Sequence, residues 1–152
     1  MFTEADIIAR YTRRQAIEDG VLIQLSGDGY EGDAWVPEMV AEAGVRFPVA
    51  MTAEAFSAYV SPIEGGSEEL APCQDIKGRL WDVLWMMKLA IVGRVPCRRL
   101  DESTIIFVVH VVPNVPKGKT RNPRAKRVEL KVACGPSDDG SPCLTVMLPE
   151  QD

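Results

Sequence analysis

The chain has 152 residues, of which 46% are hydrophobic; this is enough apolar material for one folded domain over residues 1–152, and it excludes disorder of the whole chain. The formal net charge of −5 disfavours general affinity for nucleic acid or for anionic membranes, because both repel an acidic body. The four cysteines and the one histidine lack the spacings of zinc sites, and the first residues lack an apolar signal segment, so we expect a cytoplasmic protein with reduced thiols, no metal and no other cofactor.

The first part of the chain predicts short helices around one short strand. Residues 6–19 read as one or two short helical turns, in which Thr12 can cap the residues after it. The apolar run 21–25 predicts a buried strand. Pro37 and Gly44 then bracket a small helix, because proline suits the first turn of a helix and glycine suits its end.

The next part predicts a strand, a helix and a connection. Residues 46–51 are typical of a strand, and Pro48 indicates either an edge position or a short segment, because proline cannot donate to a ladder. Thr52 is placed to cap a two-turn helix over residues 53–60. Residues 61–72 read as a solvated connection.

Residues 76–92 predict the one long helix of the chain. One apolar stripe fits a core-facing side, and a second stripe beside it carries Trp81 and Trp85. Asp82 and Lys88 lie inside the segment, which excludes a membrane span. Either the short N-terminal helices cover the tryptophans, or the tryptophans form an interface with a second copy, as a homodimer, or with a foreign protein. Asp82 is also placed to pair with an arginine three residues before it.

The last third of the chain changes to the period of strands. Residues 103–112 are dominated by β-branched side chains, residues 127–134 alternate between apolar and charged side chains, and residues 143–148 have the same strand character. They predict an antiparallel meander within a sheet of three to five strands, packed on the long helix. Because helices precede strands, the fold class is α+β.

A wholly basic segment joins the first two of these strands. Residues 116–127 carry six positive charges and no acid, and such a loop would bind a phosphate or an acidic protein surface. The alternative is a solvated hairpin loop whose lysines protect the sheet edge. We expect the two arginines before residue 100 to enlarge the patch at the same end of the sheet. The candidate binding residues are Arg98, Arg99, Lys117, Lys119, Arg121, Arg124, Lys126 and Arg127.

A short acidic segment precedes the last predicted strand. Asp138 and Asp139 are adjacent, whereas a calcium or magnesium site needs oxygen donors from several positions. An Asp-Gly pair before a strand is typical of a hairpin turn, so the segment predicts a turn and not a metal site. Cys134 and Cys143 flank this turn and would face each other across two strands, but a reducing compartment disfavours a disulfide between them.

Four segments of the chain resemble a known domain family. They are YTRRQAIEDGVLIQLS, AGVRFPVAMT, GRLWDVLWMMKLAI and KVACGPSDDGSPCLTVMLPEQD, which lie in this order and span residues 11–152. The family is of unknown function and is carried by phages, plasmids and other mobile elements. The resemblance implies no catalytic residues. It implies a setting in which small proteins bind host factors or counter host defences, including CRISPR effectors.

The leading expectation is a non-catalytic binding protein of a phage or plasmid that docks on a host protein, such as a component of a bacterial defence system. Residues 1–44 carry nine acids against three bases, whereas the loop is wholly basic, and such a dipolar surface favours steered association. One alternative is a small-ligand or nucleotide-binding module with arginines on phosphates, and another is a nucleic-acid-binding regulator. An enzyme is the least supported class, because no set of nucleophile, base and orienting group can be assembled from the residues.

Overall fold

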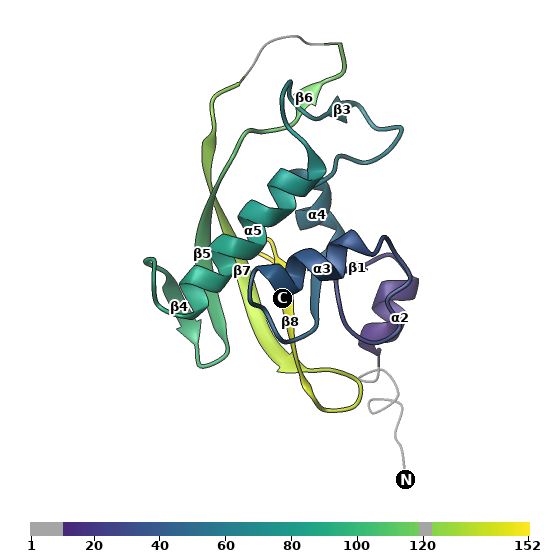
Figure 1. Ribbon diagram of the computed structural model, residues 1–152, viewed down its shortest axis with the longest axis vertical. Helices are drawn as coiled ribbons and strands as arrows, with labels where there is room; N and C mark the ends of the chain where they lie inside the picture. Colours follow the sequence, from purple (N-terminus) through teal and green to yellow (C-terminus); the bar gives the residue numbers. More distant parts are fainter. Residues whose placement is uncertain (1–10, 119–122) are drawn as a thin grey trace.

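The computed structural model describes residues 11–118 and 123–152, and within them it confirms the α+β class (Figure 1). The strands are β1 Leu22–Gln24, β2 Val49–Thr52, β3 Glu68–Glu69, β4 Arg98–Asp101, β5 Thr104–Val111, β6 Val115–Pro116, β7 Lys126–Pro136 and β8 Pro142–Met147. The helices are α2 Arg13–Glu18, α3 Trp35–Glu42, α4 Ala53–Tyr59 and α5 Ile76–Ile91.

The main sheet has the strand order β1-β2-β8-β7-β5-β4, and only the pair of β2 and β8 is parallel. The predicted meander of β5, β7 and β8 is confirmed. The sheet exceeds the expected three to five strands by one, β4, because the strands predicted at residues 21–25 and 46–51 are β1 and β2 and join one side of the meander. The strand β4 was missed because its residues, Arg-Arg-Leu-Asp, carry no alternating apolar pattern.

Of the two alternatives for this strand, the edge position was wrong, since β2 lies between β1 and β8, and the short segment was correct, since β2 has four residues. Pro48 comes one residue before the strand begins, where its missing N–H costs no ladder bond. Its carbonyl accepts a hydrogen bond from Leu144 N at 2.8 Å and so helps to align β2 with β8. The side chain of Thr52 caps α4, as predicted, by accepting a hydrogen bond from Ala55 N at 3.3 Å.

The core lies between the sheet and α5, which crosses in front of the strands in Figure 1 and packs on β5. Asp75 begins the helix, because its carboxylate accepts a hydrogen bond from Gly78 N at 2.5 Å. The fully buried side chains of the predicted stripe include Leu80, Leu84 and Met87. No helix in residues 11–118 and 123–152 is both long and apolar enough to cross a membrane.

The two tryptophans of α5 have different surroundings. Their rings stack with centroids 5.5 Å apart. Trp81 is half-buried and packs against the core, whereas Trp85 is 40% exposed. Trp81 thus contributes to the core, Trp85 offers the larger exposed surface, and contact of the two rings with a second copy or another protein stays a prediction.

Arg79 is buried. The helical spacing had predicted an ion pair between Arg79 and Asp82, and this pair does not form. Its guanidinium donates to two carbonyls at the C-terminal end of α4, to Val112 O and, at 2.6 Å, to Asn114 Oδ1. Unpaired carbonyls and the helix dipole make that end of α4 favourable for a cation. Desolvation lowers the pKa of Arg79 from its ordinary value. Arg79 thus joins α4 and α5 to the far end of β5.

The end of the chain is held by polar contacts of Gln151. Its side-chain oxygen accepts hydrogen bonds from the Thr52 hydroxyl at 2.7 Å and from Leu148 N at 2.9 Å. Its backbone carbonyl accepts a hydrogen bond from the buried Lys131 ammonium. These contacts close the end of the sheet at which β2 and β8 finish.

Truncation of two adjacent residues of α5 distinguishes the buried stripe from the exposed one. We expect Leu84→Ala to lower the free energy of unfolding by about 3 kcal/mol, because it opens a cavity in the core. We expect Trp85→Ala to lower it by less, roughly 2 kcal/mol, because 40% of the side chain stays in water in the folded chain although its ring stacks on Trp81. Urea unfolding of both variants measures the difference.

The same comparison tests the homodimer. A loss for Trp85→Ala that equals the loss for Leu84→Ala and grows with protein concentration would show that Trp85 is buried between two copies. Light scattering over the same concentration range gives the mass of the species. A monomer with a small, concentration-independent loss would contradict the dimer.

Candidate functional site

The two neighbouring arginines of β4 point to opposite faces of the sheet. Arg98 pairs in register with Ile106 and forms an ion pair with Glu129, whereas Arg99 pairs with Ile105, whose side chain is in the core. Successive side chains of a strand alternate between faces, so one patch cannot contain both. The expected joint patch of Arg98 and Arg99 was therefore wrong, and the two residues belong to two different candidate sites.

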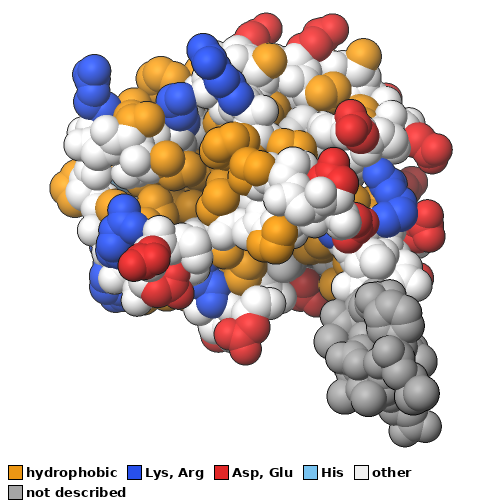
Figure 2. All heavy atoms as spheres, turned by 90° about the horizontal axis from the view of Figure 1, so that it is seen from below, with side chains coloured by type: hydrophobic (Ala, Val, Ile, Leu, Met, Phe, Trp, Pro, Cys, Tyr) orange, Lys and Arg blue, Asp and Glu red, His pale blue; other side chains and the backbone are white. Residues whose placement is uncertain are grey.

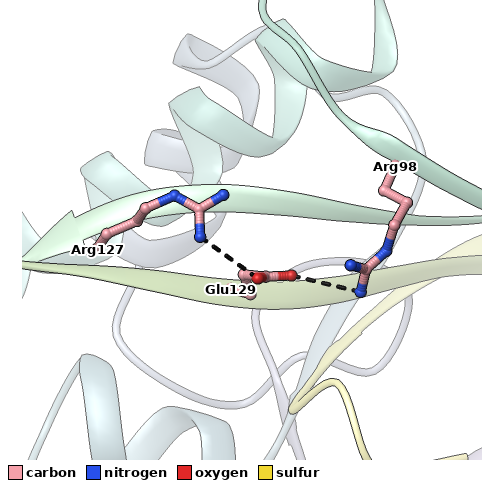
Figure 3. A network of polar contacts seen from close by, with 3 residues as sticks. All are labelled: Arg98, Arg127 and Glu129. Atoms are coloured by element: carbon pink, nitrogen blue, oxygen red, sulfur yellow. Dashed lines mark hydrogen bonds and ion pairs between the residues drawn. The ribbon is translucent and has the colours of Figure 1, made fainter.

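The first candidate site is a basic face around Glu129. Figure 3 shows that Arg127 and Arg98 reach this carboxylate from its two sides, with N–O distances of 3.3 Å and 3.4 Å. The side chains of Arg98 and Arg127 keep 66% and 61% of their surface exposed. Exposed ion pairs of this kind contribute about 1 kcal/mol or less to stability, so each arginine can leave Glu129 and bind another anion at little cost.

A groove runs beside the basic face and has a volume of about 740 Å³. Its walls combine the cations Arg98, Lys126 and Arg127 with the apolar side chains of Tyr59, Val128 and Pro149.

The stretch of β7 along this groove is paired on one side only. The pairing of β7 with β8 begins at Lys131 and Met147, so within the described chain Lys126 to Leu130 pair only with β5. A strand stretch with one partner presents backbone donors and acceptors along its other side.

The other predicted basic residues are more dispersed. Lys117 and Arg124 are exposed at the two described ends of the loop, and Lys119 and Arg121 lie outside the described residues. An acidic strand, β3, pairs with β6 at the start of the loop, and Glu69 accepts a hydrogen bond from Gly118 N at 3.2 Å. The composition of this segment had predicted only a solvated connection. Its acids offset the positive charge at this end of the loop. Among the loop cations in the described residues, Lys126 and Arg127 are the ones that line the groove.

The second candidate site is an apolar cavity of about 830 Å³, which was not predicted from the sequence. It lies between the last turn of α5, the turn from β4 to β5 and residues 44–47. Figure 2 shows apolar side chains gathered in a hollow on this side, with charged side chains around it. The cavity is formed by segments far apart in the chain, so no local pattern indicates it. Its lining includes the cations Arg46, Lys88 and Arg99 and the thiols Cys97 and Cys134.

All four cysteines are free, and the register explains why Cys134 and Cys143 do not pair. Cys134 lies opposite Leu144, and Cys143 lies opposite Gly135. The two thiols are thus one residue out of register and point to opposite faces of the sheet. Cys134 lines the apolar cavity, whereas Cys143 is buried on the other face.

The two adjacent aspartates form a structural turn, as predicted, and no group of three metal-binding side chains occurs in the described residues. Asp139 accepts hydrogen bonds from the hydroxyls of Ser137 and Ser141, each at 2.5 Å, and from Ser141 N. Asp138 accepts hydrogen bonds from the backbone amides of Arg13 and Arg14 at the start of α2. The sequence did not predict this long-range cap, because no local pattern in either segment indicates that the two segments are in contact.

The turn makes stability depend on pH. Hydrogen bonds from Ser137, then Ser141, lower the pKa of Asp139 from 3.8 to about 2. A carboxyl group whose pKa is lower in the folded than in the unfolded state stabilises the fold at pH values above the unfolded-state pKa. This stabilisation is lost as pH falls from about 4 to about 2. We therefore expect Asp139→Asn to be less stable than the parent at neutral pH and to show a shallower loss across this window.

Urea unfolding at a series of pH values measures this effect. Asp28→Asn is the matched control, because Asp28 is an exposed aspartate whose carboxylate accepts no hydrogen bond in the described residues. Equal pH profiles for Asp139→Asn and the parent would contradict the assignment.

The comparisons with known proteins concern the family and not the activity. No curated protein and no solved structure matches the chain significantly. A family described as a family of unknown function, DUF6573, matches residues 1–152, which agrees with the resemblance to an uncharacterised family. The chain therefore belongs to the family of unknown function DUF6573.

Proposed function

We propose that this protein is a non-catalytic binding protein that docks on an acidic, extended segment of a partner protein. The observation that carries the proposal is the one-sided pairing of β7 from Lys126 to Leu130, beside a groove with three cations in its walls. Extended segments bind such strands by adding a further strand to the sheet, with backbone hydrogen bonds for affinity and side-chain pockets for specificity.

The charges of the groove select an acidic segment. Arg98 and Arg127 pair with the one carboxylate of the groove, Glu129, and Lys126 also lines the groove, which therefore carries a local positive excess on a chain of net charge −5. In the free protein, Glu129 occupies the place that a carboxylate of the partner would take between the two arginines. An incoming carboxylate exchanges with Glu129 or adds beside it, at little cost because the existing pairs are exposed.

The same geometry makes a nucleic acid or a nucleotide a weaker candidate. Arg99 faces away from Arg98, so the two cannot contact one phosphate group together. Among the residues that line the groove, Tyr59 is the one aromatic, whereas single strands are bound by successive stacked bases. The acidic net charge also opposes a long polyanion more than it opposes one short acidic segment.

The identity of the partner comes from the resemblance and is part of the proposal. The protein acts for a phage, plasmid or other mobile element in the bacterial cytoplasm, and its partner is a host protein, such as a defence component that includes CRISPR effectors. Attraction between the basic groove and an acidic segment speeds the encounter, and this effect weakens as salt rises.

Binding of a defined probe tests the groove. The probe is a fluorescein-labelled peptide of alternating Glu and Val, whose acids and apolar side chains fit alternate faces of an added strand. We expect saturable binding, weakened about tenfold or more by Arg127→Glu through charge repulsion. We expect Glu129→Gln to strengthen binding severalfold, because it removes the internal competitor. Fluorescence anisotropy at two salt concentrations measures both effects.

The matched control is Arg94→Glu, which reverses an exposed arginine that does not line the groove. Equal losses for Arg94→Glu and Arg127→Glu would contradict the site, as would a peptide that binds Glu129→Gln no better than the parent. Capture from a bacterial host lysate extends the test to the natural partner. A captured protein should be retained by Arg94→Glu and lost by Arg127→Glu, and recovery of this chain alone counts against the proposal.

A further inference from the structure

We propose that the apolar cavity at the end of α5 binds a small amphipathic anion, with a carboxylate or phosphate head and an apolar body. This site is separate from the groove beside β7 and does not depend on the proposed function. Its volume of about 830 Å³ lies within the range of small-molecule sites.

The floor and the mouth of the cavity are apolar. Ile105, Val132 and Leu144 line it and are almost completely buried, so the cavity reaches the core of the molecule. Phe47 and Ile91 also line it, yet they are 45% and 47% exposed. An apolar ligand body would cover these two side chains, which favours binding because it removes apolar surface from water.

The charges around the cavity determine the head group. Three cations, Arg46, Lys88 and Arg99, line it together with one acid, Glu102. Lys88 donates to Gly44 O at 2.7 Å, and Arg99 donates to two backbone carbonyls. The ion pairs found in the described residues involve other arginines, so these three cations have no carboxylate partner there.

An opposing charge comes from α5 itself. The C-terminal end of a helix carries about half a negative elementary charge. Three cations outweigh this partial charge and the one carboxylate of Glu102 together, so the local field remains positive. A positive field over an apolar cavity fits an anion with an apolar body better than a neutral or cationic ligand.

Decanoate and decyl phosphate, used below their micelle concentrations, are the probes, and decanol is the neutral comparison. We expect saturable binding of the two anions at one site by calorimetry, with decanol at least about tenfold weaker because it forms no charge-assisted hydrogen bond. We expect Arg46→Gln to weaken decanoate binding about fivefold, as suits one exposed charge contact, and Arg94→Gln to leave it unchanged.

The thiols give a second readout that does not depend on a variant. Cys97 lines the cavity and is exposed, whereas Cys73 is exposed elsewhere, so bound decanoate should slow alkylation of Cys97 and not of Cys73. Absence of binding overturns the proposal, as do equal affinities for decanoate and decanol, or equal effects on the two thiols. Shielding of Cys97 in a dimer without ligand also overturns it and would assign the cavity to an interface between copies.

Discussion

Burial of one face of α5 against the sheet is the interaction on which the rest of the structure depends. Leu80, Leu84 and Met87 leave water completely in this packing, and each such side chain contributes roughly 1.5–3 kcal/mol of hydrophobic stabilisation. The helix also fixes the neighbouring elements at its two ends. Near its start, Arg79 holds the end of α4, and at its last turn Ile91 forms part of the apolar cavity. The packing of one helix thus sets the position of the cavity.

Polar contacts between distant segments stabilise the fold in addition to the apolar packing. Asp138 accepts hydrogen bonds from the first amides of α2, and Gln151 joins Thr52 to the end of the chain. In both cases a segment close to the C-terminus holds an element of the N-terminal half. The segments that carry the family resemblance therefore meet in space, in contacts that are structural. The two candidate binding sites lie around Glu129 and at the end of α5, and the second of them is lined in part by these same segments.

The elements with a strong local pattern could be predicted, and the sites made by distant residues could not. The stripe of α5, the alternation of β7 and the cap at Thr52 each depend on residues a few positions apart, so periodicity and capping rules find them. The six-stranded order, the pairing of β3 with β6 and the apolar cavity depend on which distant segments pack together. The composition of residues 116–127 predicted the basic loop, but only the strand register shows that Arg98 and Arg99 lie on opposite faces of the sheet.

The place of β8 in the sheet has a consequence for the order in which the chain can fold. This strand follows all the other described strands along the chain, yet it lies between β2 and β7 in the middle of the sheet. Until its residues leave the ribosome, the two halves of the sheet have no strand to join them, and the sides of β2 and β7 that await β8 are unpaired. The sheet of the nascent protein therefore cannot close before β8 has been synthesised, and until then the waiting sides of β2 and β7 are open to association with other strands.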